Sequence, residues 1–346
     1  MKDSIMATNV ANYPLIDIEE LKRTGKVFRE NAGASIIDIG DRIGLVEFHT
    51  KANAISDDIV DMLFIAAQEG VKMFDALVIG NRGRHFSAGA NLSFLLELAR
   101  SASWNKTDQA FRRLQDANMM LKYGPVPVVA AAFSNALGGG AEIVLHADKV
   151  VAAADLHIGL VEAGVGLIPA GGGTKELRLR ALDHFGNNGN GDLMDAIQEV
   201  FKVIFSAKVS KDGEEAKQFF LSAGDIIAPS GQPPIEQAKQ AALELVKAGY
   251  RNPGPKTDIP VPGRSGISIF RNRIDYMLHS KEITEHDAVI ARHLVTILCG
   301  GDVASGTTSE QHFLDLEREA FFSLLGTQKT QERIEYLLKN NKRLHN

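Results

Sequence analysis

The chain has 346 residues, of which 45% are hydrophobic and 23% are charged, and its formal net charge is -5. This length allows two average domains or one large one, and the composition is that of a globular protein rather than a disordered or fibrous one. The charge balance argues against a nucleic-acid-binding surface. The single cysteine, Cys299, excludes an intramolecular disulfide and a cysteine-based zinc site.

The N-terminus and the longest apolar stretch bear on where the protein works. Residues 1–12 lack the apolar run of a secretory signal. The longest apolar candidate, 126–137, is too short to span a membrane and is interrupted by Ser134 and Asn135. Together with the single cysteine, these features lead us to expect a cytoplasmic protein without a membrane span.

The first part of the chain divides into a leader and a hairpin. Residues 1–35 carry mixed charge and little periodicity, so we expect a leader or linker there, with a short helix around 18–27. Two β-rich runs follow at 36–39 and 43–48, and the Gly-Asp-Arg between them resembles a hairpin turn.

A unit of strand, helix and strand then recurs along the chain. The elements expected in order are a helix from Asp57, a strand at 76–79, helices at 92–101 and 107–122, a strand at 126–133, a helix at 139–147 and a strand at 150–152. This alternation indicates an α/β core with largely covered strands, which we assign to residues 36–185.

The remaining residues, 186–346, are expected to form a helical C-terminal region. A Pro/Gly-rich connector is expected near 252–266. Amphipathic helices are predicted at 192–205, 214–222, 235–248, 268–279, 288–298, 313–325 and 331–339.

Two glutamates stand in glycine-rich apolar stretches where a core is expected. Glu142 lies in Leu137-Gly-Gly-Gly-Ala-Glu-Ile143, and Glu162 follows twenty residues later, without a basic neighbour. An unpaired carboxylate in an apolar setting has a raised pKa, so such groups are usually paired or used in chemistry. Glu162 is therefore a candidate proton donor beside a better-solvated, ionised partner. It could also cap the region around Thr174 or make a subunit contact.

Backbone amides near the first acid could bind an oxyanion. The glycines at 138–140 follow an apolar strand and open a helix, whose first N–H groups lack partners within the helix. This turn could also serve packing alone. A second small-residue loop at 87–90 could supply another donor or be an ordinary surface turn. Two such amides would polarise one carbonyl, each contributing about 3–4 kcal/mol in an oxyanion hole.

Other segments give weaker signals. The run 171–175 lacks the residue order of a P-loop, and 186–191 follows a helix rather than a strand, so we expect both to be loops that do not bind phosphate. His146 and His157 have no partners at metal-ligand spacing, and His85 is expected to be a polar loop residue.

Taken together, these motifs resemble the crotonase, or enoyl-CoA hydratase/isomerase, superfamily over about residues 36–182. The resemblance rests on the order and spacing of the segments 85–92, 127–131, 137–142 and 160–174. Residues 277–287 and 327–334 are similar to the C-terminal hydratase part of fused 3-hydroxyacyl-CoA dehydrogenase/enoyl-CoA hydratase proteins. The dehydrogenase part is expected to be absent from this chain.

The resemblance implies an α/β fold of the crotonase type, a ββα spiral core with a helical C-terminal region, assembled as a homo-oligomer. The amides of Ala90 and Gly139 would form the oxyanion hole, and Glu142 and Glu162 match the two acid/base positions of hydratases. The residues that match CoA-binding stretches are Lys51, Ala52, Ala54, Ala88 and Leu92.

The implied reaction is syn addition of water to 2-trans-enoyl-CoA thioesters in fatty-acid β-oxidation. The substrate would be an acyl-CoA thioester, and no metal or redox cofactor is implied. A 3-hydroxyacyl-CoA dehydrogenase is expected as a separate partner or as a fused domain.

Three positions depart from the family pattern: Ser134 and Ala170 stand where glycine is usual, and Asn91 stands where aspartate is common. Serine tolerates a positive φ less well than glycine, whereas Ala170 keeps its N–H. Two alternative functions stay open. One is a Δ3-Δ2 enoyl-CoA isomerase, which can work with the acid at 162 alone, and the other is a non-catalytic acyl-CoA-binding subunit of a dehydrogenase assembly.

Overall fold

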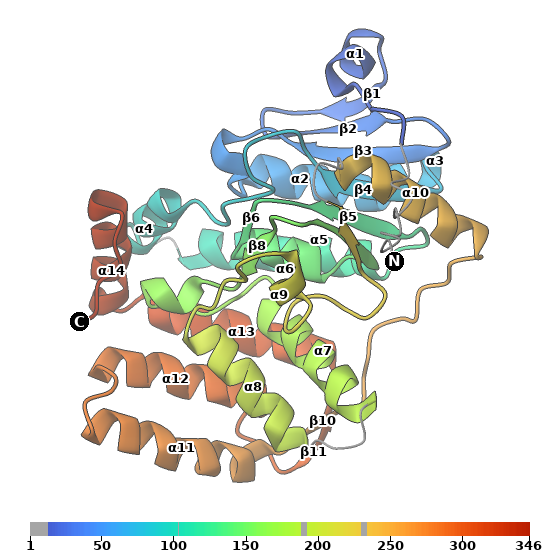
Figure 1. The fold of residues 1–346 in the computed structure, drawn as a ribbon. Helices are drawn as coiled ribbons and strands as arrows, with labels where there is room; N and C mark the ends of the chain where they lie inside the picture. The colour runs from blue at the N-terminus through green and yellow to red at the C-terminus, as the bar shows by residue number, and fades with distance from the viewer. Residues whose placement is uncertain (1–12, 103, 188–191, 230–233) are drawn as a thin grey trace, which may run out of the picture.

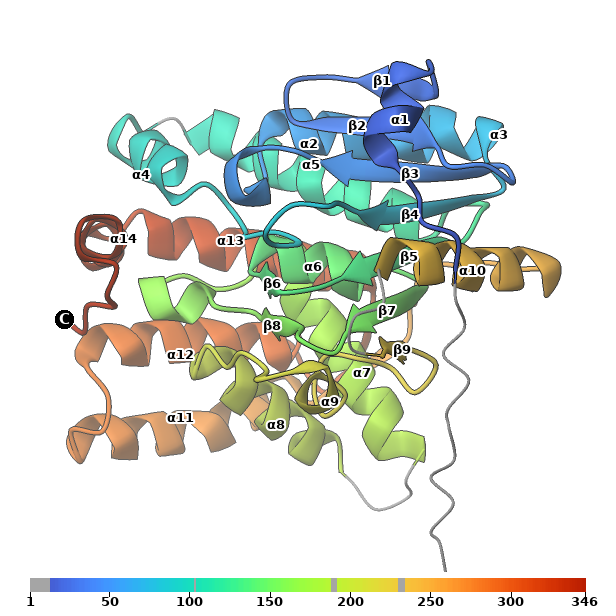
Figure 2. The same cartoon turned by 45° about the horizontal axis from the view of Figure 1, so that its top comes forward.

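The computed structural model describes residues 13–102, 104–187, 192–229 and 234–346. A seven-stranded sheet forms the centre and has helices on both faces (Figures 1 and 2). The first three strands of the sheet pair antiparallel, and every later pair is parallel. In spatial order its strands are β1 (Val27–Glu30), β2 (Ala34–Asp38), β3 (Ile43–Phe48), β4 (Ala76–Gly80), β5 (Val128–Ala132), β7 (Lys149–Ala153) and β9 (Ile226–Ala228).

The predicted hairpin and the strands after it are found in the structure. β2 and β3 pair with Ile36 opposite Val46, and Gly40 in the turn between them has a φ of 85°, which suits glycine. All residues of β3, β4 and β5 are buried. These central strands are therefore covered on both faces, as their nearly continuous apolar sequences indicate.

The expected leader is in part built into the fold. Residues 18–23 form the helix α1 (Ile18–Arg23), and β1 pairs with β2 at the edge of the sheet, with Arg29 opposite Ile36. The linker interpretation is therefore wrong for these two segments. A four-residue edge strand that is only half-buried carries little apolar alternation, which is why periodicity does not reveal it. Residues 1–12 lie outside the described part of the chain.

The helices that cover one face of the sheet, and the loops between them, carry the cavity described below. The predicted helix α2 begins at Asp57, as expected, with Ser56 as its N-cap. The helix expected from 107 begins earlier, at Trp104. A short parallel pair, β6 (Asn135–Leu137) and β8 (His157–Gly159), lies beside α6. The elements of this region are η1 (Lys51–Asn53), α2 (Asp57–Ile65), η2 (Ala66–Gly70), α3 (Val71–Met73), α4 (Leu92–Arg100), α5 (Trp104–Lys122), α6 (Gly139–Leu145) and η3 (Glu162–Val165).

The C-terminal region is not a purely helical addition. β9 adds the last strand to the central sheet, and α10 packs across β4, β5 and β7 on the opposite face from α2. A two-stranded sheet of β10 and β11 falls within and after the expected connector. The elements are α7 (Gly173–Asn187), α8 (Leu193–Phe205), α9 (Gly213–Ala216), α10 (Pro234–Lys247), β10 (Ile259–Val261), α11 (Gly263–His279), α12 (Glu285–Leu298), β11 (Gly306–Thr308), α13 (Glu310–Leu325) and α14 (Gln328–Asn340).

Several local predictions need correction here. The helix expected over 214–222 ends at Ala216, and within the connector only residues 252–258 and Pro262 lack regular structure. The run 171–175 is not a loop throughout, because α7 begins at Gly173. Part of the other glycine-rich segment, residues 188–191, lies outside the described residues.

Contacts in the chain's second half tie α13 and α14 to the core. Lys175 on α7 pairs with Glu310 on α13 at 2.7 Å, and both side chains are buried. α14 packs on α4 and on η3, so the end of the chain lies beside segments from its first half (Figure 2). Residues far apart in sequence therefore meet around one region of the fold.

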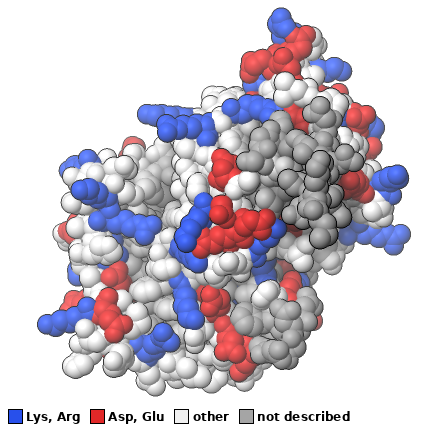
Figure 3. Space-filling model, in the orientation of Figure 1, with Lys and Arg blue, Asp and Glu red and all other residues white. Residues whose placement is uncertain are grey.

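The described helices include none long and apolar enough to cross a membrane. On the face shown in Figure 3, lysine and arginine side chains are interspersed with aspartate and glutamate rather than gathered into one basic surface.

Candidate active site

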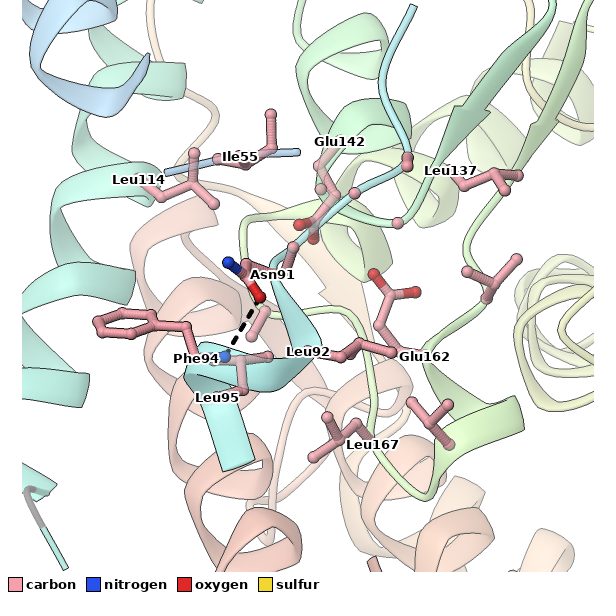
Figure 4. A pocket seen from close by; sticks show the side chains of 18 of the residues that line it. Ile55, Asn91, Leu92, Phe94, Leu95, Leu114, Leu137, Glu142, Glu162 and Leu167 are labelled. Atoms are coloured by element: carbon pink, nitrogen blue, oxygen red, sulfur yellow. Dashed lines mark hydrogen bonds between the residues drawn. The ribbon is translucent and has the colours of Figure 1, made fainter. Parts of the chain in front are cut away.

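A cavity of about 530 Å³ lies between α4, α5 and the segment that joins β6 to α6. Glu142 and Glu162 both reach it, and Figure 4 shows their carboxylates pointing toward one another inside it. The structure therefore brings the two predicted acids to one place. The wall around them is mainly apolar and includes Ile55, Val60, Leu92, Leu95, Phe111, Leu114, Leu137, Val161, Val165 and Leu167.

The turn before α6 lies against Glu162. β6 pairs with β8, and the Gly138 amide donates a hydrogen bond of 2.9 Å to the carbonyl of Gly159. Gly138 has a φ of 52°, and a Cβ added there would lie 3.1 Å from Oε1 of Glu162. Strand pairing therefore places the start of α6 beside the acid that follows β8, and glycine is what allows the close approach.

The loop before α4 is fixed against the same turn. The Leu137 amide donates to the Ser87 carbonyl at 3.0 Å. Gly89 has a φ of 87°, and a Cβ there would lie 2.7 Å from the Leu137 carbonyl oxygen. A Cβ built on Gly139 would lie 3.9 Å from the Ala90 nitrogen, and both of these residues line the cavity. The two amides expected to bind an oxyanion are therefore neighbours.

Replacing Gly140 with alanine is expected to separate these two segments. The new Cβ would lie 2.5 Å from the Cβ of Ser87, so α6 would have to move away from the loop that carries Ala90. We expect a loss of about 1–3 kcal/mol in the free energy of unfolding, together with reduced turnover. Denaturant unfolding and kcat measure the two effects. Gly306→Ala is the control because its Cβ would meet nothing within 4 Å, and equal behaviour of both variants would contradict the prediction.

Glu142 is held by the turn that precedes α7. Glu142 is only 3% exposed to solvent. Its Oε1 accepts hydrogen bonds from the amides of Gly171 at 2.7 Å and Gly173 at 2.8 Å. Burial raises the pKa of Glu142 to about 7, although these two amides and the charge of Lys175 oppose that shift. A carboxyl with such a pKa can accept a proton near neutrality.

The carboxylate of Glu162 has fewer hydrogen-bond donors around it than that of Glu142. Its Oε2 is buried and has no hydrogen-bond partner among the described residues. Burial, and next the charge of Glu142, raises the pKa of Glu162 well above its usual range. The two acids thus favour opposite protonation states, with Glu142 the better base and Glu162 the better proton donor.

The residues expected at the CoA-binding stretch divide into two groups. Ala88 and Leu92 line the cavity, whereas Lys51, Ala52 and Ala54 do not. The latter three lie in or directly after η1, where the Ala52 carbonyl accepts the Ala88 amide at 3.1 Å. Their part in binding CoA stays a prediction.

The three departures from the family pattern all have local structural partners. Ser134 adopts a φ of 46°, which costs a non-glycine residue about 1–2 kcal/mol, and its Oγ lies 3.0 Å from Nδ1 of His85. Asn91 is the N-cap of α4 and accepts the Phe94 amide at 3.2 Å (Figure 4). Ala170 lines the cavity, and its carbonyl accepts a hydrogen bond of 2.8 Å from Gln115.

The two histidines whose spacing offered no metal partner, His146 and His157, make structural contacts. His146 is buried, its Nδ1 lies 2.7 Å from the Glu142 carbonyl, and burial lowers its pKa to about 3. His157 contacts the Ser210 carbonyl through Nδ1 at 3.0 Å. Among the described residues, no cluster of three or more His, Cys, Asp and Glu side chains is placed to hold a metal ion.

Sequence reasoning missed another buried carboxylate close to this site, Glu317 of α13. It accepts the Gly172 amide at 2.8 Å and the Lys175 amide at 2.7 Å, directly behind the turn that holds Glu142. A signal was present in the sequence, since Glu317 is four residues from both Phe313 and Phe321 and so shares their apolar helical face.

Comparison with known proteins shows which sequences and folds this chain resembles. Residues 38–184 match the model of the enoyl-CoA hydratase/isomerase family. A Bacillus subtilis relative named "Probable 3-hydroxyacyl-CoA dehydrogenase" is 40% identical over 337 residues, which is 97% of this chain and 42% of the relative. The 2,3-dehydroadipyl-CoA hydratase of Escherichia coli is 36% identical over 126 residues, covering 36% of this chain and 46% of that protein.

Solved structures show the same fold. The crystal structure of an enoyl-CoA hydratase from Bacillus halodurans matches with a TM-score of 0.60 at 16% identity, over 88% of this chain and 100% of that one. The chain spans about two fifths of the length of the Bacillus subtilis relative. The predicted crotonase-like α/β core with a helix-rich C-terminal part is confirmed by this similarity. Residues 38–184 therefore match the enoyl-CoA hydratase/isomerase family, and the chain has the fold of solved enoyl-CoA hydratases.

Proposed function

We propose that this protein catalyses the syn addition of water to 2-trans-enoyl-CoA thioesters, as in fatty-acid β-oxidation. One observation carries the proposal: Glu142 and Glu162 face a single cavity beside the neighbouring residues Ala90 and Gly139. The family match supplies the class of chemistry, and the two acids supply the means for hydration.

In the proposed reaction, the amides of Ala90 and Gly139 bind the thioester oxygen. Ionised Glu142 takes a proton from a water molecule as the water oxygen forms a bond to C3. Protonated Glu162 delivers its proton to C2, and the C2–C3 double bond becomes single. Negative charge that develops on the thioester oxygen is held by the two amides, each contributing about 3–4 kcal/mol. Burial raises the pKa of both acids, and the charge of Glu142 raises that of Glu162 in addition, which supports these roles.

The pH dependence of hydration should show two limbs. Burial raises the pKa of Glu142 to about 7, so kcat/KM should increase as pH rises through this value and Glu142 loses its proton. At higher pH kcat/KM should fall, because Glu162, whose pKa is raised further by the charge of Glu142, is then deprotonated. Rates measured from about pH 5 to 10 test this expectation. A profile without the low-pH limb would contradict the role of Glu142 as the base.

The direct test is turnover by the purified chain. Crotonyl-CoA and longer 2-enoyl-CoA thioesters should lose their conjugated absorbance and yield 3-hydroxyacyl-CoA. Tight binding of acyl-CoA without turnover would favour a binding subunit. Conversion of 3-enoyl-CoA to 2-enoyl-CoA without hydration would favour the isomerase. The range of chain lengths turned over would also define the acyl specificity.

We further propose that a 3-hydroxyacyl-CoA dehydrogenase acts next on the product, either as a partner or as a domain of the same protein. The name of the Bacillus subtilis relative and its greater length support this connection. A coupled assay with this chain, a 3-hydroxyacyl-CoA dehydrogenase and NAD should reduce NAD only when 2-enoyl-CoA is supplied. Absence of coupled NAD reduction would contradict the proposed link to a 3-hydroxyacyl-CoA dehydrogenase.

A further inference from the structure

Glu317 is a buried carboxylate that plays no part in the reaction steps above. It lies on α13, outside residues 38–184, and its side chain is inaccessible to solvent. Both of its oxygens are engaged, since Oε2 accepts the Gly172 amide at 2.8 Å and Oε1 accepts the Lys175 amide at 2.7 Å. Burying a carboxylate is unfavourable unless it is paired, so the burial of Glu317 requires a structural or functional reason.

The amides bound by Glu317 alternate with those bound by Glu142. Glu142 Oε1 takes the amides of Gly171 and Gly173, while Glu317 takes those of Gly172 and Lys175. The turn at 171–175 is therefore clamped between one carboxylate from α6 and another from α13. Gly172 has a φ of 101°, a conformation that L side chains rarely adopt, so the turn requires glycine at this position.

The opposite side of the turn is also held. Asn118 on α5 donates to the Gly171 carbonyl at 3.0 Å, and Gln115 donates to the Ala170 carbonyl at 2.8 Å. These bonds fix carbonyl groups, whereas Glu317 provides the acceptor for the Gly172 amide. Without it, that amide and the amide of Lys175 would be buried without their present acceptor. The backbone of the turn would then change conformation at the residues whose amides orient Glu142.

We propose that Glu317 is a positioning residue for proton transfer at Glu142. By binding the Gly172 and Lys175 amides, it sets the turn so that the Gly171 and Gly173 amides meet Oε1 of Glu142 and aim the carboxylate into the cavity. The inference rests on the proposed hydratase function and assigns a role in the site to α13.

Glu317→Gln tests the proposal because the side chain keeps its length. The amide nitrogen of glutamine cannot accept a hydrogen bond, so one of the two backbone donors loses its partner. We expect the kcat of crotonyl-CoA hydration to fall roughly 10- to 100-fold, while KM changes by less than about threefold, because the substrate-binding wall is untouched. A kcat equal to that of the wild type would overturn the proposal.

A double-mutant cycle separates positioning from general destabilisation. If Glu317 acts through Glu142, then adding Glu317→Gln to Glu142→Gln should lower the residual kcat by less than about twofold. If the substitution lowers kcat by the same factor in both backgrounds, Glu317 is merely structural and the proposal fails.

Glu236→Gln is the matched control. Glu236 is a buried carboxylate on α10, the helix whose apolar residues pack on the opposite face of the sheet. It pairs with Arg82 and accepts the Ile16 amide at 2.8 Å. Its loss should lower Tm but leave kcat within about twofold, since no residue of α10 lines the cavity.

Glu317→Asp keeps the proposal testable if the glutamine variant does not fold. Aspartate retains both acceptors but is one methylene shorter, so kcat should lie between those of the wild type and an inactive enzyme. A wild-type kcat in this variant would overturn the role of Glu317. A wild-type chain that fails to hydrate any 2-enoyl-CoA would overturn the proposed function itself, whereas normal hydration by Glu317→Gln would overturn only this inference.

Discussion

Replacing Glu142 with glutamine is expected to lower the kcat of hydration by roughly 10²- to 10⁴-fold. Glutamine can still accept the Gly171 and Gly173 amides through its carbonyl oxygen, so the turn should keep its shape. It cannot take a proton from water near neutral pH, and the step at C3 loses its base. Steady-state kinetics with crotonyl-CoA measures the loss.

Binding distinguishes a lost base from a damaged site. The dissociation constant for a saturated acyl-CoA, measured by calorimetry, should stay within about threefold of the wild-type value, because the apolar wall and the two amides are unchanged. Glu236→Gln again serves as the control for removal of a buried carboxylate. A Glu142→Gln variant that hydrates at the wild-type rate would exclude Glu142 as the base. If it loses hydration but isomerises 3-enoyl-CoA at the wild-type rate, the isomerase is the better assignment.

Replacing Glu162 with glutamine should lower the rates of both hydration and isomerisation, each by roughly 10²-fold or more. The reason is that both reactions need a proton transfer by the acid at this position. In hydration it delivers a proton to C2, whereas in isomerisation of 3-enoyl-CoA it removes a proton from C2 and returns one to C4, and an amide can do neither. Initial rates with 2-enoyl-CoA and 3-enoyl-CoA, compared with those of Glu142→Gln, measure the difference between the two acids. Hydration that survives in Glu162→Gln would show that another group protonates C2.

The same substitution should make the protein more stable at alkaline pH. Burial and the charge of Glu142 raise the pKa of Glu162 in the folded state, while an unfolded glutamate titrates near about 4.3. Between these two values the folded protein holds a proton that the unfolded chain releases, so this contribution to stability is full below the unfolded pKa and is lost as pH rises through the folded one. Glutamine does not titrate. The Tm of Glu162→Gln should therefore exceed that of the wild type at pH 8 by more than at pH 5, and an unchanged difference would contradict the raised pKa.

The elements with strong periodicity could be predicted, and those held by packing alone could not. α4, α8 and α10 begin and end close to the expected residues because their apolar positions recur at helical spacing. β1 and β9 are short strands that join the sheet at its two edges, and neither has enough alternation to be recognised. The start of α7 at Gly173 was missed because glycine is a poor helix former, and the carboxylates that bind its first amides come from elsewhere in the chain.

The sequence by itself determined the chemical groups of the candidate site. Two glutamates in apolar, glycine-rich stretches, and small residues where a backbone must approach closely, are properties of residue type and local spacing, so they can be read without coordinates. Only the tertiary structure decided which groups meet. Gly171 binds Glu142 across 29 residues, and Gly172 binds Glu317 across 145. Such contacts arise from strand pairing and helix packing, and local sequence patterns do not encode them. The part of α13 in holding the turn at 171–175 therefore became visible only in the folded chain.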